Sequence, residues 1–201
     1  MIQDLIDELI TYISTSGREE EVARVREKFF WEVGGIFGEE DSFDMRIGTF
    51  FEWFIIDRRI GGTSILEEYC EKIDDEERKN TFLTMRDSIR SVFEVTGSSS
   101  DRLNLRDLND KKKYVALTPW GSPYFKKKDI LEVRLFADGN DLIMSQSYIN
   151  HPQNVKKYII SRFKDAALSN DKDKVVNELA VMSFKWEKYR KFRIEDIYNN
   201  N

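Results

Sequence analysis

The sequence predicts an α+β protein with a helical N-terminal block, a five-stranded antiparallel sheet or small partly open barrel, and C-terminal helices. Apolar residues recur at helical spacing before residue 91 and again after residue 151. Between them lie five short segments of alternating or β-branched residues, separated by turn-forming residues. We therefore divide the chain into residues 1–90, 91–150 and 151–201, and expect these blocks to form one compact unit.

The first two helices are predicted over about residues 2–16 and 18–33. In the first, apolar residues return every three or four positions, and Gly17 follows as a stop signal. The second opens with three glutamates, which favour the positive N-terminal end of a helix dipole. Glycines at 34, 35 and 38 end it.

The stretch FFEWFIIDRRIGGTSILEEY indicates a buried helix followed by a turn. A helix from about Phe43 to Asp57 would be too apolar around its circumference to lie on a surface. The glycine pair at 61 and 62 supplies the turn. Two short helices follow, and their candidate N-terminal caps are Thr63 or Ser64 and Asp74 or Asp75.

Five segments predict the strands: VFEV, RLNLRDL, KKYVALT, ILEVRLF and DLIMSQSYI. Serines 98 to 100, Asn109-Asp110, the stretch from Pro119 to Pro123 and the DGND sequence at 138 provide the turns between them. Helical spacing then returns, and the chain closes with the basic, aromatic segment FKWEKYRKFRIEDIY, which we expect to form an amphipathic helix.

Composition restricts the class of protein. The chain of 201 residues is 40% hydrophobic and 34% charged, which is typical of a globular protein. Its single cysteine, Cys70, excludes an internal disulfide framework and a Cys-rich zinc site. We expect a cytoplasmic protein with no membrane span and no cofactor. The net charge of −5 is uneven, at −10 for residues 1–90, +1 for 91–150 and +4 for 151–201.

Part of the sequence resembles a known family. The strings FFEWFIIDRR, GGTSILEEY, SVFEV, LNLRDL and KKKDILEVRLF are similar to an uncharacterised bacterial family of hypothetical proteins. In that family an FEEWF-type helix leads to a small β domain with an RDL strand and a KGD-like turn, and some members carry a C-terminal SEC-C zinc motif. The resemblance covers about residues 50–150 and implies a fold without an activity. One cysteine cannot form a SEC-C site, so this chain departs from those members.

Two lysine runs with aromatic residues between them are the main candidate binding site. On a small barrel, basic residues interleaved with aromatic ones are typical of single-stranded nucleic-acid binding, although lysines also protect sheet edges from pairing. Arg58 and Arg59 could bind an anion, or they could complement the dipole at a helix end while Asp57 pairs with one of them. The candidate binding residues are Lys111, Lys112, Lys113, Trp120, Tyr124, Lys126, Lys127, Lys128, Arg58 and Arg59.

No catalytic or metal-binding residue is predicted. His151 has no second histidine or cysteine near it in sequence and no adjacent carboxylate to orient it, so we expect it to close the last strand. Cys70 is expected to be a buried thiol. The acidic runs at 39–41 and 74–77 could collect a divalent cation, but they are also typical helix starts.

Three functions follow from these observations. The first is a non-catalytic protein-interaction or adaptor module whose partner is another protein. The second is a nucleic-acid or ribosome-associated protein that uses the lysine runs. The third is a divalent-metal-dependent enzyme, which needs acidic residues that converge in a deep pocket. The sequence leaves the oligomeric state open.

Overall fold

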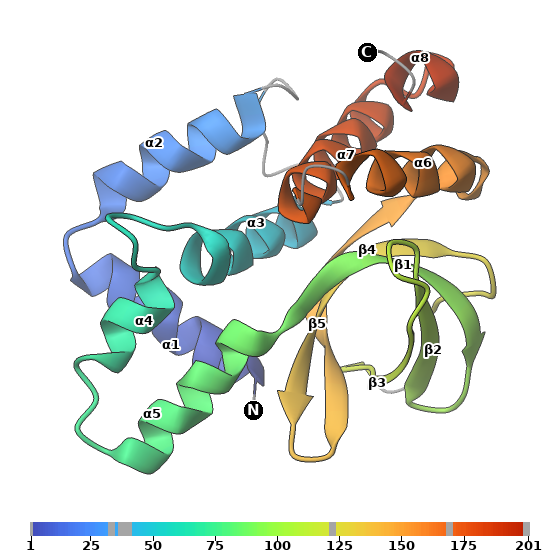
Figure 1. The fold of residues 1–201 in the computed structure, drawn as a ribbon. Coiled ribbons are helices and arrows are strands. Elements are labelled where there is room, and N and C mark those ends of the chain that lie inside the picture. The colour runs from blue at the N-terminus through green and yellow to red at the C-terminus, as the bar shows by residue number, and fades with distance from the viewer. Residues whose placement is uncertain (1, 32–34, 36–41, 121–123, 168–170, 199–201) are drawn as a thin grey trace.

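The structure is a computed structural model that describes residues 2–31, 35, 42–120, 124–167 and 171–198. Helices on one side and along the top surround a small β-barrel (Figure 1). In chain order the elements are α1 (Ile2–Thr15), α2 (Glu19–Phe30), α3 (Phe43–Glu52), the π-helical turn η2 (Trp53–Asp57), α4 (Ile65–Cys70), α5 (Glu76–Leu83), the 3-10 turn η3 (Thr84–Asp87), β1 (Ile89–Ser98), β2 (Arg102–Asp107), β3 (Lys113–Leu117), β4 (Ile130–Asp138), β5 (Asp141–His151), η4 (Gln153–Val155), α6 (Lys156–Ala166), α7 (Lys172–Lys188) and α8 (Ile194–Tyr198).

The predicted α+β class is confirmed, and local signals place most element boundaries. Ser64 caps α4 through a reciprocal capping box with Glu67, and Asp75 accepts a hydrogen bond from a backbone N–H at the start of α5. The glycine turn at 61 and 62 has positive φ at both positions, which residues with a Cβ rarely adopt. Glycines 34 and 38 of the predicted helix stop lie outside the described residues.

The five predicted strands form a closed barrel in the order β1-β2-β3-β5-β4. Every pair is antiparallel except β3 and β5, which run parallel and match at only two positions. The sheet is therefore mixed and closed, where the sequence predicted an antiparallel sheet or a partly open barrel. β4 lies between β3 and β5 in sequence but pairs with β1 and β5. Because β4 is antiparallel to β5, the chain returns along β5 in the direction of β3.

Three aromatic rings pack together at the barrel interior, and we call them the aromatic plug. It consists of Trp120, Phe125 and Tyr148, with ring centroids 4.9–6.4 Å apart and edge-to-face geometry. Such edge-to-face contacts contribute about 0.5–1.5 kcal/mol per pair beyond burial. The plug continues the apolar barrel interior, to which Phe93, Leu131 and other strand residues contribute.

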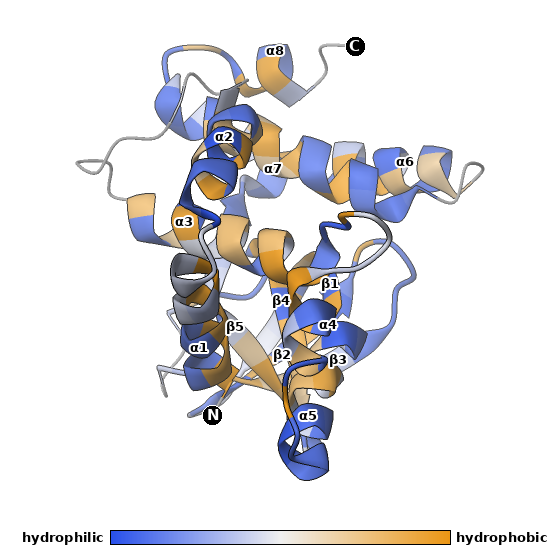
Figure 2. Cartoon of the chain, turned by 90° about the vertical axis from the view of Figure 1, so that its left-hand side faces the viewer, coloured by the Kyte–Doolittle hydropathy of each residue, from blue (hydrophilic) through white to orange (hydrophobic). Residues whose placement is uncertain are grey.

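Helices from both ends of the chain pack on the outside of β1, β4 and β5. The helices α1 to α5 share a core with Phe136 of β4 and Ile149 of β5. The helices α6 to α8 share another with Val92 of β1 and Ile130 of β4. Hydropathy follows this arrangement, since α5 on the periphery is mainly hydrophilic while hydrophobic residues gather where α3 meets the strands (Figure 2). The outward sides of β2 and β3 keep exposed residues.

No helix in the described part of the chain is both long enough and apolar enough to cross a membrane.

The helical block approaches the barrel closely at Gly48. This glycine of α3 faces Ser147 of β5, and a Cβ on it would lie 3.0 Å from the Ser147 Cβ and 1.9 Å from its Oγ. Glycine therefore sets the distance between α3 and the sheet.

We expect Gly48→Ala to destabilise the protein by about 1–3 kcal/mol, because the new methyl group overlaps Ser147. In an unconstrained helix the same change stabilises by roughly 0.5–1 kcal/mol, so the sign of the effect is diagnostic. Urea unfolding of the single variant and of Gly48→Ala with Ser147→Gly measures it. A stabilised single variant, or no recovery in the double variant, contradicts this account.

Candidate functional site

The predicted lysines and aromatic residues lie on the barrel, whereas Arg58 and Arg59 do not join them. Arg58 donates to Glu21 of α2 at 3.0 Å, and Arg59 pairs with Glu67 of α4. Among the described residues, no ion pair joins Asp57 to either arginine, so the expected local pair is wrong. Its carboxylate instead accepts a hydrogen bond from Arg134 of β4. Both arginines next to Asp57 serve contacts between helices.

The outward side of β2 and β3, with the described part of the loop before β4, forms one surface that we call the bare barrel face. Along each of the two strands, buried and exposed side chains alternate, as a strand with one face in the barrel requires. Lysines 111 to 113 and 126 to 128 are exposed. The residues of this face are Arg102, Asn104, Arg106, Lys111, Lys112, Lys113, Val115, Leu117, Trp120, Tyr124, Lys126, Lys127 and Lys128.

Strand register places the lysine runs on either side of this face. Lys113 of β3 lies opposite Arg106 of β2, which lies opposite Glu94 of β1. On the far side of β1, the backbone N–H of Lys128 donates to the carbonyl of Val95 at 2.8 Å. One run therefore borders the face along β3 and the other along β1.

Each lysine run contains a residue in the left-handed backbone region. The φ of Lys111 is 65° and that of Lys128 is 81°, and no other non-glycine residue of the described chain has a positive φ. This conformation costs a residue with a Cβ roughly 1–2 kcal/mol. Glycine or asparagine would fit both turns better, so a lysine at each turn suggests a role other than stability.

Several cations of the face have no anionic partner. Lys112 pairs with Asp110 at 3.1 Å, Arg102 pairs with Asp141 at 2.9 Å, and Arg106 pairs with Glu94. In the part of the chain that the structure describes, the other five lysines of the two runs make no ion pair of this kind.

The carboxylate of Glu94 stays charged beside Arg106. Burial acts to raise the pKa of Glu94, but hydrogen bonds from Lys156 and Arg106 outweigh burial and lower that pKa below its ordinary value. This region therefore keeps fixed charges of both signs, with the unpaired positive charge on the lysines.

The two aromatic candidates differ in exposure. Trp120 is 37% exposed because its ring belongs to the aromatic plug, whereas Tyr124 is 83% exposed. Tyr124 is thus a free aromatic ring among lysines, and Trp120 presents only part of its indole.

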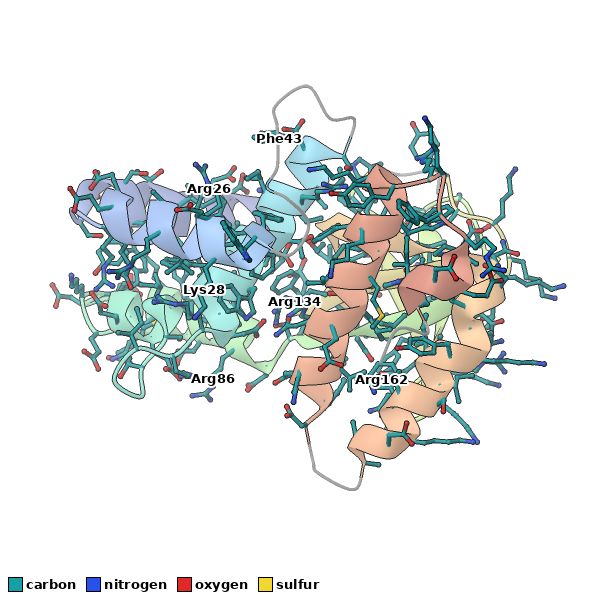
Figure 3. The ribbon with its side chains drawn as sticks, turned by 90° about the horizontal axis from the view of Figure 1, so that it is seen from above. Arg26, Lys28, Phe43, Arg86, Arg134 and Arg162 are labelled. Atoms are coloured by element: carbon teal, nitrogen blue, oxygen red, sulfur yellow. The ribbon has the colours of Figure 1, made fainter. Side chains whose placement is uncertain are left out.

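A second group of polar residues lies buried between the helical block and the barrel. Arg90 of β1 and Arg134 of β4 lie directly opposite each other in the strand register. Seen from above, Arg134 lies between the N-terminal helices and α7 (Figure 3). We call the two arginines and the three carboxylates around them the buried charge cluster: Glu52, Asp57, Arg90, Glu132 and Arg134.

Hydrogen bonds occupy most of the N–H donors of the two guanidinium groups. Arg90 donates to Glu132 at 2.7 Å and to Asn177 of α7 at 2.8 Å. Arg134 donates to Ser88 at 2.9 Å and to Asp57, and its Nε lies 3.6 Å from Glu52. The cluster therefore joins α3, η2, β1, β4 and α7.

The cluster holds three carboxylates for two guanidinium groups, so one carboxylate is left without full compensation. Glu52 is that group, because it is 6% exposed and its nearest cation, Arg134, is shared with Asp57. Burial raises the pKa of Glu52 to about 7, against the opposing effects of Arg134 and of the hydrogen bond from Ser145. A protonated Glu52 leaves the cluster neutral.

His151 has a carboxylate neighbour that its own sequence context does not show. Its Nε2 lies 3.7 Å from Glu132 Oε2, and its Nδ1 lies 3.1 Å from the hydroxyl of Tyr198. His151 is the last residue of β5, as predicted, and all three side chains are buried. The alternation of charged and apolar residues in ILEVRLF was the available signal, since Glu132 and Arg134 share one face of an otherwise apolar strand.

The buried charge cluster has no room for a substrate. The cavity beside it has a volume of about 10 Å³, which is enough for one water molecule. In the described residues, no group of three or more His, Cys, Asp or Glu side chains is arranged to hold a metal ion. Asp75 caps α5, and residues 39–41 lie outside the described chain. What the contacts of the cluster show is a link from α3, η2 and α7 to β1 and β4.

The fold and the exposed site define a small α+β protein whose five-stranded barrel carries a basic face and is held to its helices by a buried charge cluster. The chain belongs to a family of unknown function, DUF7986, whose family model matches residues 7–195. This confirms the expectation of an uncharacterised family. No curated protein and no solved structure matches the chain.

We expect stability to depend on pH through Glu52. Because its folded-state pKa is raised from 4.5 to about 7, its protonation stabilises the fold fully below pH 4.5, and this contribution is lost as pH rises through 7. The loss amounts to about 3 kcal/mol at 1.36 kcal/mol per pKa unit. Denaturant unfolding of wild type and Glu52→Gln between pH 5 and 8 measures it.

Glutamine mimics the protonated carboxyl group, so the variant should gain stability relative to wild type as pH rises. A constant difference between the two proteins over this range would show that Glu52 does not titrate there. Asp107, whose pKa burial also raises, is present in both proteins and cancels in the comparison.

Proposed function

We propose that this protein is a non-catalytic binding protein whose bare barrel face binds single-stranded nucleic acid. The observation that carries the proposal is that both lysine runs and Tyr124 are exposed and border the outward side of β2 and β3, to which helices do not add a layer. The other sides of the barrel are covered, so a ligand as long as an oligonucleotide has this face available.

The strand order supports the proposal by topology alone. A closed five-stranded barrel with the order β1-β2-β3-β5-β4 resembles the OB type of barrel. In proteins with that fold, the face of strands 2 and 3 and the loops beside it bind oligonucleotides or oligosaccharides. The bare barrel face occupies the same strands here. Since one fold can serve many functions, the residues on the face carry more weight than the fold.

The charge distribution agrees with a polyanionic ligand despite the acidic chain. Residues 1–90 carry a net charge of −10, and α1 to α5 lie on the opposite side of the barrel from β2 (Figure 1). The acidic block is therefore turned away from the bare barrel face. At physiological salt the Debye length is about 8 Å, so distant acids repel a strand on the face only weakly.

A single strand fits the face better than a duplex does. Bases of a single strand can stack on exposed aromatic rings, which contributes about 1–3 kcal/mol per base. Tyr124 offers such a ring beside lysines 126 to 128, and Val115 adds an apolar contact, at 47% exposure, near the centre of the face. In a duplex the bases are already paired and stacked, and these side chains would have no base to contact.

The lysines with positive φ allow binding to be separated from stability. We expect Lys111→Gly with Lys128→Gly to leave the fold unchanged or stabilise it by up to about 1 kcal/mol, because glycine relieves the backbone strain. The same variant should bind a fluorescent oligo-dT or oligo-U more weakly. Its slope of log affinity against log salt should fall by about 1.4, which corresponds to two lost phosphate contacts.

Fluorescence anisotropy over a salt series and thermal unfolding give the two readings. Lys164→Ala on α6 is the matched control, since it removes an exposed lysine away from the barrel face. A duplex of the same sequence should bind less tightly than the single strand. Equal binding by the double variant and the wild type, at every salt concentration, would refute the proposal.

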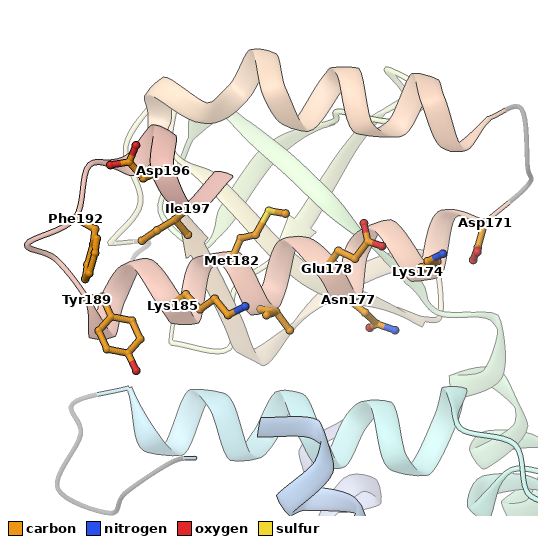
Figure 4. A pocket seen from close by; sticks show the side chains of 11 residues that line it. Asp171, Lys174, Asn177, Glu178, Met182, Lys185, Tyr189, Phe192, Asp196 and Ile197 are labelled. Carbon is orange, nitrogen blue, oxygen red and sulfur yellow. The ribbon is translucent and has the colours of Figure 1, made fainter. Parts of the chain in front are cut away.

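Docking of another protein is the second candidate, and the C-terminal helices favour it. The prediction of a single amphipathic helix over FKWEKYRKFRIEDIY is wrong, because α7 ends at Lys188 and α8 begins at Ile194. Phe184 is buried in the core, but Tyr189 and Phe192 remain 43% and 61% exposed. With Val181, Met182 and Ile197 they form the apolar part of a groove of about 970 Å³ along α7 (Figure 4). The groove is also lined by polar residues: Asp171, Lys174, Asn177, Glu178, Lys185 and Asp196. An amphipathic helix of a partner protein suits such a lining.

For this candidate we expect a partner captured from native lysate to survive nuclease and high salt, because apolar contacts are insensitive to ionic strength. Tyr189→Ser with Phe192→Ser should abolish that capture and leave oligonucleotide binding intact. Capture that persists in this variant rules out the groove as the docking site. Capture that nuclease removes assigns the interaction to nucleic acid.

A further inference from the structure

The middle of the bare barrel face is a row of three residues from three neighbouring strands. Asn104 of β2 lies opposite Val115 of β3 on one side and opposite Gly97 of β1 on the other. Residues directly opposite each other in paired strands belong to the same face of the sheet. Asn104 and Val115 are both exposed, so these three residues, which we call the central row, lie on the outward side of the barrel.

The side-chain amide of Asn104 is open to a ligand. In the part of the chain that the structure describes, no hydrogen bond reaches this amide. The two arginines that β2 also turns outward already have partners, since Arg102 donates to Asp141 at 2.9 Å and Arg106 donates to Glu94 at 3.1 Å. An amide with a donor and an acceptor therefore lies between two arginines that hold carboxylates.

A β-bulge and a glycine give this amide its space. The register of β1 and β2 shifts between Val95 and Gly97, and the Thr96 hydroxyl donates to the backbone carbonyl of Asn104 at 3.0 Å. A Cβ on Gly97 would lie 3.4 Å from Asn104 Nδ2, so the amide lies beside the place of the missing side chain.

The backbone does not require glycine at position 97, because Gly97 is not among the glycines with positive φ. Glycine within a strand weakens it, and commonly marks a bulge or a place where a ligand approaches closely. Bulges are also frequent beside functional sites, where they re-aim a side chain. The central row has the bulge, the glycine and the unoccupied amide together.

We propose that the central row contacts one base of the bound strand, and that the base it favours is adenine. This inference rests on the proposed function of the bare barrel face. Asparagine pairs with adenine through two hydrogen bonds, because the amide accepts from the amino group of the base and donates to a ring nitrogen. Val115, which is 47% exposed, offers an apolar contact to the same base, and a purine covers more of it than a pyrimidine does.

Guanine suits the central row less well than adenine. Its N7 and O6 atoms both accept hydrogen bonds and are matched by arginine or lysine, and the central row contains no cation. The lysine runs border the face, where they can hold phosphates. Such phosphate contacts position a strand without reading its sequence, so the preference for a base depends on Asn104.

Competition against a fluorescent oligo-dT tests this inference. The competitors are oligo-dT strands of one length that are unsubstituted or carry one central deoxyadenosine, deoxyguanosine or deoxycytidine. We expect the deoxyadenosine strand to bind most tightly, by about five-fold or more over unsubstituted oligo-dT. Equal affinities for all four strands overturn the inference and leave nucleic-acid binding by the face intact. If none of the four strands binds, both the inference and the proposed function fail.

Variants of the central row assign the preference to its residues. Asn104→Leu should remove the preference for adenine but keep the affinity for oligo-dT within about two-fold, since the lysines still hold the phosphates. Gly97→Val should act in the same way, because its side chain takes the space beside the amide. Asn80→Leu, at an exposed position of α5, is the matched control and should keep the preference.

Thermal unfolding shows whether each variant folds, and Asn104→Leu is decisive because its position is exposed and its side-chain amide has no partner to lose. A preference for adenine that persists in Asn104→Leu overturns the inference. Loss of oligo-dT binding in that variant, with the fold intact, also overturns it, because Asn104 would then contribute to affinity in general and not to the choice of base.

Discussion

Two arginines that face each other across neighbouring strands set the main constraint on this structure. Arg90 and Arg134 are direct partners in the pairing of β1 and β4, and like charges in this arrangement repel. Pairing of these strands therefore requires carboxylates close to both guanidinium groups, to compensate their charge. Glu132 comes from the sheet itself, but Asp57 and Glu52 come from the helical block. The position of α3 on the barrel is thus an electrostatic requirement as well as an apolar contact, and Gly48 permits the close distance that it needs.

The buried charge cluster lets one short chain carry both an acidic helical block and an exposed set of lysines. The acidic helices neutralise the arginines on one side of the barrel, while the lysines on β3 and before β4 stay on the other side and largely without partners. Replacement of the cluster by apolar residues could give equal or greater stability, since buried ion pairs contribute little net free energy. What the charges provide is orientation, because hydrogen bonds from Arg90 and Arg134 fix α3, η2 and α7 relative to the same pair of strands.

Local signals in the sequence predicted the local structure well. The five strands, the glycine turn after η2 and the capping residues Ser64 and Asp75 all depend on neighbours within a few positions. Partners that are distant in sequence were not predictable in this way. Asp57 binds Arg134, which is 77 positions away, and not the adjacent arginines, because the strand buries Arg134 and leaves it more in need of an anion. The parallel β3–β5 pair and the contact of His151 with Glu132 likewise depend on how the strands are connected. The lysine and aromatic candidates were found from sequence because exposed residues keep their chemistry whatever they pack against.

Tyr148 connects the barrel interior with the loop before β4. Its ring packs against Trp120 and Phe125, and Phe125 belongs to the apolar core of the barrel. Trp120 is partly exposed and lies next to the loop that carries Tyr124 and the second lysine run. A ligand that displaces the Trp120 ring must therefore repack side chains inside the barrel, and by thermodynamic reciprocity a change in that packing changes the affinity for the ligand.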